Sequence, residues 1–131
     1  MKKFLFALIQ KEGKQVEHIN YIFCTDKYLL GINQQYLNHN TYTDIVTFEL
    51  SEPPAALLSD VYISIDRVRE NSATFQTSFL QELRRVMIHG ALHLCGYGDK
   101  KLLQKKLMTQ KEDYYLSLLE VSRGTDALKS F

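Results

Sequence analysis

Two histidines and one aspartate lie close together in the sequence and could hold a divalent metal ion. His89 and His93 are four residues apart, and Asp99 follows after two glycines. On an α-helix, this spacing places two side chains about 40° apart around the axis and one turn apart along it, so both imidazoles can reach one ion. Two imidazoles and a carboxylate suit zinc and leave a coordination position open. The pattern predicts a metal-dependent hydrolase whose catalytic group is the metal-bound water held by these three residues.

Simpler explanations of the same stretch remain open at this point. A histidine pair with this spacing is more often a feature of a helix surface or core than a metal site. Cys95 is a rival ligand, but a continuing helix turns it about 200° away from His93 and toward the core, so we leave it out. Gly90 stands where helical zinc peptidases carry a glutamate base, which argues against ordinary peptidase chemistry. We expect one divalent ion, zinc, on His89, His93 and Asp99.

Apolar patterns predict the elements that must position these residues. We expect helices over 3–12, 26–37, 67–74, 78–95 and 100–120, and strands over 18–24, 44–50 and 60–65. The residues expected to face inward from the last helix are Leu103, Leu107, Tyr114 and Leu118. Strands interspersed with helices predict an α+β fold, with a single small mixed sheet packed against helices. The metal site would lie on the C-terminal half of a helix and the loop after it, in a zincin-like arrangement.

The composition describes one domain without a dominant charge. The 131 residues, 45% of them apolar, are too few for two ordinary domains, so we expect a single domain over 1–131 with a loose tail at 124–131. A formal net charge of +1 gives no overall field that attracts nucleic acid. Cys24 and Cys95 form no disulfide framework, and no stretch has the length of a signal core or a membrane span. We therefore expect a cytoplasmic protein with no membrane association and no disulfide partner.

Four ordered blocks resemble one known family. The blocks are N-Q-Q-Y at 33–36, T-D-I-V-T-F at 43–48, S-D-V-Y-I-S at 59–64 and H-G-A-L-H-L-C-G-Y at 89–97. They are similar to the signature segments of the YbeY family, bacterial metal-dependent endoribonucleases and rRNA maturation factors. The resemblance covers roughly residues 19–120. It implies a sheet with helices and a zinc-like ion on three residues of the last block. It also implies action on single-stranded rRNA with the ribosomal small subunit, including the 3′ end of its rRNA.

The chain departs from the family pattern at several positions. The third ligand of the family is usually a histidine, whereas this chain has Asp99 there. An anionic ligand would offset part of the charge of the ion. The arginine that commonly follows the N-x-x-Y tyrosine is Leu37 here, which affects phosphate binding. The chain also begins near the first helix, so we expect the usual first strand to be missing.

Phosphodiester cleavage needs cations that balance the charge developing on phosphate. The candidates for RNA contact are Arg67, Arg84, Arg85, Lys100 and Lys101. Lysines at 100, 101, 105, 106 and 111 form the one dense basic cluster, which could follow an RNA backbone or simply be a solvated helix face.

Two aspartates lie near the starts of predicted strands. Asp44 and Asp60 could support a ligating histidine, although a turn or cap role is favoured. His18 and His39 have no partner at a ligand spacing, and Tyr97 is expected to pack over the site.

A zinc peptidase or other small-molecule hydrolase would share the metal site. A non-catalytic ribosome-associated RNA-binding module would tolerate the loss of the arginine and of the third histidine.

Overall fold

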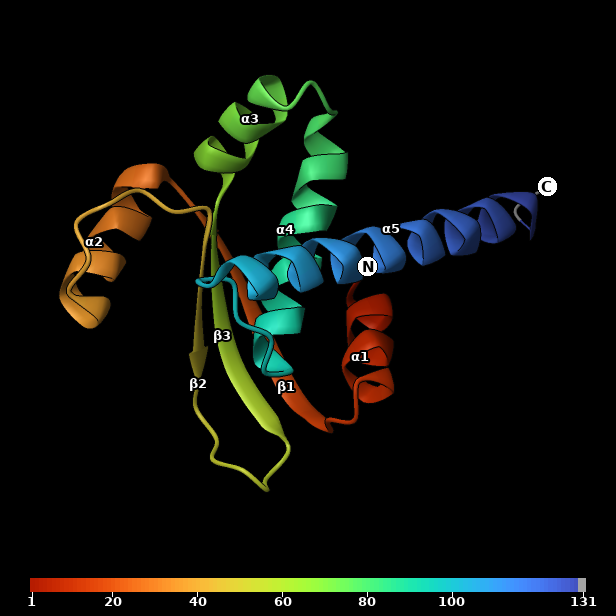
Figure 1. Ribbon diagram of the computed structural model, residues 1–131, viewed down its shortest axis with the longest axis horizontal. Helices are drawn as coiled ribbons and strands as arrows, with labels where there is room; N and C mark the ends of the chain where they lie inside the picture. The colour runs from red at the N-terminus through yellow and green to blue at the C-terminus, as the bar shows by residue number, and fades with distance from the viewer. Residues whose placement is uncertain (130–131) are drawn as a thin grey trace.

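A three-stranded mixed sheet lies at the centre of the fold, with helices on both sides of it (Figure 1). The computed structural model describes residues 1–129, and the side chains of residues 1–121. Its elements are, in chain order, α1 (Lys2–Lys11), β1 (Val16–Cys24), α2 (Asp26–Leu37), β2 (Ile45–Glu49), β3 (Leu57–Ser64), α3 (Ile65–Thr74), α4 (Phe79–Leu94) and α5 (Leu102–Lys129). The predicted α+β fold with one small mixed sheet is confirmed.

The strand β3 lies in the middle of the sheet. It pairs in parallel with β1 and antiparallel with β2, so the strand order is β1-β3-β2. Alternate residues of β3 are buried, and Val61 and Ile63 belong to the hydrophobic core. The strand begins at Leu57 rather than at residue 60, because the Leu57 amide bonds to the Gln15 carbonyl oxygen at 2.7 Å and extends the pairing.

The helix α4 runs through the core and carries the histidine pair. Its first turn is capped by Ser78, whose hydroxyl oxygen accepts a hydrogen bond from the Gln81 amide at 3.1 Å. The helix packs against α1, α3, α5 and β2. A Cβ atom at Gly90 would lie 2.5 Å from Cδ1 of Ile45, so the glycine lets α4 approach β2 closely. The histidines are therefore attached to one of the most rigidly packed elements of the molecule.

The helix α5 crosses α4 and buries a different stripe from the one predicted. Leu103, Leu107 and Tyr114 are 78%, 43% and 44% exposed, so their assignment to the inner face is wrong. Leu118 is half-buried and packs against the core, as predicted. Up to residue 121, where the description of side chains ends, the buried residues of α5 are Met108, Glu112, Tyr115, Leu116 and Leu119. The prediction followed apolar and aromatic residues and did not include Glu112, whereas the packing against α4 buries a stripe that contains it.

The end of the chain is partly outside the described residues. The helix α5 continues to Lys129 instead of ending near residue 120. Residues 130 and 131 are outside the described range, so a loose tail over 124–131 stays a prediction. No described helix combines the length and the apolar character needed to cross a bilayer. Cys24 and Cys95 are both free thiols.

Candidate metal centre

The three residues singled out by spacing converge on one point. The Oδ2 atom of Asp99 lies 3.2 Å from Nε2 of His89 and 3.3 Å from Nε2 of His93. One ligand atom from each residue lies within 4.8 Å of the other two. The two imidazole rings are nearly perpendicular, with centroids 4.4 Å apart. Among the described residues, this is the one group of histidine, cysteine and carboxylate side chains arranged to share an ion.

A sharp turn after α4 brings Asp99 back to the histidines. Gly96 has a φ of +101°, a left-handed conformation that favours glycine. The Tyr97 amide then bonds to the carbonyl oxygen of Leu92 at 3.1 Å, which folds the chain back onto the last turn of the helix. The predicted helix break at this glycine thus places the carboxylate beside the imidazoles.

Each histidine is oriented through its Nδ1 atom. His89 Nδ1 lies 2.7 Å from Oε2 of Glu112, and His93 Nδ1 lies 2.8 Å from the carbonyl oxygen of Tyr97. Since a carbonyl and a carboxylate accept hydrogen bonds, both Nδ1 atoms are the donors in these contacts. In the neutral imidazoles, both Nε2 atoms then carry the lone pair and lie next to Oδ2 of Asp99. Metal-ligating histidines are held in this way, so the donor set fits a divalent cation such as zinc.

Glu112 is the functional residue that sequence reasoning missed. It projects from α5, is 7% exposed, and its Oε1 atom forms an ion pair with Nη1 of Arg85 at 2.9 Å. The other guanidinium nitrogen of Arg85 pairs with Asp113 at 2.8 Å. The available signal was a glutamate in register with the buried residues Met108 and Tyr115 of the same helix.

Several acidic groups surround His89. Burial lowers the pKa of this imidazole, but the Glu112 carboxylate, with Asp44 and Asp99, more than offsets that effect, and the net result is a raised pKa. Burial raises the pKa of the Asp44 carboxyl, and the nearby His89 opposes the shift. A centre with three carboxyl groups around one imidazole attracts a cation electrostatically.

The triad opens into a cavity of about 650 Å³. The opposite wall is the loop between α2 and β2, which is held by the buried side chain of Asn33. The side-chain amide nitrogen of Asn33 donates to the backbone carbonyl oxygen of Thr41 at 2.9 Å. The backbone carbonyl oxygen of Asn33 accepts a hydrogen bond from the backbone amide of His39 at 3.2 Å. The loop brings His39 and Asp44 to the wall of the cavity that holds the histidine pair and Asp99. No spacing in the sequence linked His39 to this site.

The candidate RNA contacts are distributed unevenly around the cavity. Lys100 lines it, and Lys101 is exposed at the start of α5. Arg67 forms an ion pair with Asp26 at 2.9 Å and stacks over the ring of Tyr42, which also lines the cavity. The remaining two candidates, Arg84 and Arg85, are neighbours on α4 and are half-buried. Arg85 forms ion pairs with Glu112 and Asp113.

Two other predicted positions lie away from the cavity lining. Asp60 accepts a hydrogen bond from the Asn20 side chain on the neighbouring strand at 3.1 Å, which is a role within the sheet. The Tyr97 hydroxyl donates to Glu12 at 2.5 Å, so the backbone of this tyrosine contacts His93 while its ring turns elsewhere. Burial raises the pKa of the Cys95 thiol to about 11, which agrees with leaving this residue out of the ligand set.

An α+β fold that presents two helical histidines and a loop carboxylate in an open cavity is typical of metal-dependent hydrolases. The family model described as Endoribonuclease YbeY matches residues 1–120. The chain belongs to the endoribonuclease YbeY family, so the resemblance stated from the four sequence blocks is confirmed.

Relatives of known name cover most of the chain. The protein named Endoribonuclease YbeY of Flavobacterium psychrophilum is 52% identical over 118 residues, which is 90% of this chain and 84% of that protein. The protein of the same name from Karelsulcia muelleri is 48% identical over 118 residues, which is 90% of this chain and 83% of the relative. The solution structure of TM1509 from Thermotoga maritima is 30% identical and has a TM-score of 0.66, covering 95% of this chain and 82% of that one.

Proposed function

We propose that this chain is a metal-dependent endoribonuclease that hydrolyses phosphodiester bonds of single-stranded RNA. Its substrate is rRNA in the cytoplasm, including the 3′ end of the small-subunit rRNA, and its macromolecular partner is the ribosomal small subunit. The observation that carries the proposal is the convergence of Nε2 of His89, Nε2 of His93 and Oδ2 of Asp99 in an open cavity. Membership of the endoribonuclease YbeY family supports this reaction over other hydrolyses.

The cofactor we propose is one zinc ion held by His89, His93 and Asp99. When bound, zinc supplies Lewis-acid chemistry, which polarises a phosphoryl oxygen and lowers the pKa of coordinated water to about 7. Glu112 and the Tyr97 carbonyl hold the imidazoles in one tautomer, and the Asp99 carboxylate offsets part of the ionic charge.

The substrate phosphate needs cationic contacts that replace the arginine expected at Leu37. We assign this role first to Lys100 and His39, because both line the cavity opposite or beside the metal ligands. A lysine ammonium and an imidazole can donate to non-bridging phosphate oxygens. Lys101 extends the basic surface along the start of α5, where an RNA backbone could continue. Arg67, Arg84 and Arg85 stay weaker candidates, because Arg67 and Arg85 are engaged by carboxylates.

A chelator experiment tests the proposal. Zinc-loaded protein should cleave single-stranded RNA, and the chelated protein, His89→Ala and Asp99→Ala should not. A matched control is His18→Ala, because His18 is exposed on β1 and its ring bonds to Asn20 at 2.6 Å. In cells, the two ligand variants should accumulate unprocessed small-subunit rRNA. Normal processing in both variants would contradict the proposal.

A peptidase function is not favoured. Gly90 occupies the place of the peptidase glutamate, and a Cβ atom there would lie 2.5 Å from Cδ1 of Ile45, whose side chain would have to shift. The general base of that chemistry therefore has no position on α4.

A further inference from the structure

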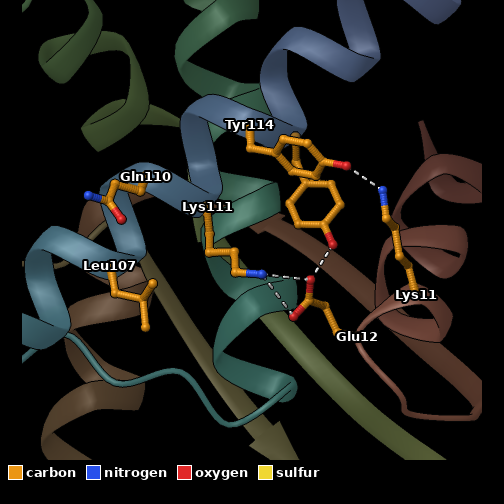
Figure 2. Close-up of a pocket in the computed structure, with 7 residues that line it drawn as sticks. Lys11, Glu12, Leu107, Gln110, Lys111 and Tyr114 are labelled. Carbon is orange, nitrogen blue, oxygen red and sulfur yellow. Dashed lines mark hydrogen bonds and ion pairs between the residues drawn. The ribbon is translucent and has the colours of Figure 1, made fainter.

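A second buried carboxylate, Glu12, lies beside α5 and is separate from the metal ligands (Figure 2). Its side chain is 10% exposed and accepts hydrogen bonds from three side chains. The Tyr97 hydroxyl bonds to Oε1 at 2.5 Å, the Lys111 ammonium bonds to Oε2 at 3.3 Å, and the Tyr115 hydroxyl also bonds to Oε2. This cluster, the Glu12 cluster, joins the end of α1 to the loop after α4 and to α5.

The position of Glu12 is unfavourable for the helix to which it belongs. It is the C-cap residue of α1, where the negative end of the helix dipole repels a carboxylate. Burying a charged group also costs free energy unless hydrogen bonds and an opposite charge compensate it. Glu12 is therefore stabilised by its partners outside α1, which are Tyr97, Lys111 and Tyr115.

Tyr97 connects the Glu12 cluster to the metal centre. Its hydroxyl is bonded to Glu12, and its carbonyl oxygen accepts the hydrogen bond from Nδ1 of His93 at 2.8 Å. The same residue lies two positions before Asp99 in the turn that returns this ligand to the histidines. Fixing the phenol therefore fixes the peptide that orients one ligand and precedes another.

Lys111 provides a second connection. It bonds to Glu12 and directly precedes Glu112, whose carboxylate holds His89. Both supports of the histidines, the loop after α4 and this turn of α5, are thus attached to one carboxylate.

We propose that Glu12 is a positioning residue of the metal centre, acting through Tyr97 and Lys111 to set its affinity for the ion. The inference rests on the proposed function only in requiring a metal at His89, His93 and Asp99. Outer partners of metal ligands typically change affinity by about 10- to 100-fold. Because Glu12 acts one residue further away, we expect an effect of about 10-fold, at the lower end of that range.

The test is the zinc dissociation constant, measured by competition with a chromophoric chelator at neutral pH. Glu12→Gln and Tyr97→Phe should each weaken zinc binding about 10-fold. The double variant should be no weaker than the weaker single variant, since Tyr97→Phe breaks a connection that Glu12→Gln already disturbs. Unchanged affinity in both single variants, or losses that simply multiply, would overturn the proposal.

Lys11 offers the matched control. It precedes Glu12, and both residues line a pocket between α1 and α5, but the Lys11 ammonium bonds to the Tyr114 hydroxyl at 2.5 Å instead of to the carboxylate (Figure 2). Lys11→Ala should therefore leave the zinc dissociation constant unchanged. An equal loss in this variant would mean that any change in the pocket weakens the metal site, and would contradict a specific role for Glu12.

A second measurement separates positioning from folding. Tyr97→Phe removes the hydroxyl and keeps the carbonyl that holds His93, so it should fold even if Glu12→Gln does not. In the metal-free protein, amide hydrogen exchange over residues 95–99 should be faster in this variant than in the wild type. Unchanged exchange there would count against the proposal. Failure of the proposed function is distinguishable, because it would appear as wild-type protein that binds zinc and leaves RNA intact.

Discussion

Two largely buried carboxylates, Glu112 on α5 and Glu12 at the end of α1, would support the proposed metal centre in different ways. Glu112 touches a ligand directly, since its Oε2 atom lies 2.7 Å from Nδ1 of His89. Glu12 touches no ligand and reaches His93 through the hydroxyl and then the backbone of Tyr97. His89 is thus held by a side chain, which a substitution can remove. His93 is held by a backbone carbonyl, which a substitution can only move.

This difference predicts how each half of the site responds to substitution. Loss of Glu112 removes the acceptor of His89 outright and leaves Arg85 with one carboxylate fewer. Loss of Glu12 leaves the Tyr97 carbonyl in place and only loosens the segment that carries it. Effects should therefore decrease from the ligands to Glu112 and then to Glu12.

The largest effect is expected from the ligands themselves. His89→Ala should reduce zinc affinity and RNA cleavage by more than about 100-fold, because it removes a ligand and also leaves Oε2 of Glu112 without its histidine partner. Equilibrium dialysis with metal analysis measures the first, and cleavage of a labelled single-stranded RNA measures the second. Stoichiometric zinc in this variant would contradict the ligand assignment.

The next effect is expected at Glu112. Glu112→Gln should weaken zinc binding by about 10- to 100-fold, because a neutral amide is a poorer acceptor for His89 and no longer neutralises Arg85. Asp113→Asn is the matched control, since Asp113 is the exposed neighbour that also pairs with Arg85. If the two variants lose affinity equally, the direct contact to His89 is not what matters.

A smaller effect, dependent on pH, is expected from the Glu12 carboxylate. Burial raises its pKa, but hydrogen bonds from Tyr115, Tyr97 and Lys111 outweigh burial and lower it overall. A lowered pKa in the folded state stabilises the protein above the ordinary carboxyl pKa, and this contribution is lost as pH falls through the folded-state value. Glu12→Gln should therefore cost about 1–3 kcal/mol of unfolding free energy at pH 7.

Denaturant unfolding of the metal-free protein across pH measures this contribution. The difference between wild type and Glu12→Gln should shrink as pH falls below about 4.5. A difference that stays constant over this range would show that the charge of Glu12 is not involved.

The smallest effect on metal binding is expected from Asp99→His. This change installs the ligand that is usual in the family, and imidazole and carboxylate are both accepted by zinc. The dissociation constant should change by less than about 10-fold, because the helical histidines and their Nδ1 partners are untouched. Complete loss of zinc would indicate that the turn after Gly96 positions a carboxylate and no other group.

The same contrast explains what could be predicted from the sequence. The triad was accessible because its signals are local: a spacing of four on a helix, a glycine that ends the helix, and a carboxylate shortly after it. The supports were not accessible, because His89 and Glu112 are separated by 23 positions and Glu12 and Tyr97 by 85. Such pairs are brought together by tertiary packing, and apolar periodicity along the sequence does not predict contacts between distant residues.

The α5 stripe shows the same limit within a single helix. Its exposed leucines, such as Leu103, suggested a core face, whereas the buried face includes Glu112. Apolar periodicity cannot identify a buried charge whose partners lie on another element.

Reconstitution of RNA cleavage tests the central claim most directly. Protein stripped by chelator should cleave no single-stranded RNA, and one equivalent of zinc should restore cleavage in the wild type but not in His89→Ala. Full activity of the stripped wild-type protein, or equal restoration in the variant, would contradict the assignment of His89, His93 and Asp99 as the metal centre of this endoribonuclease.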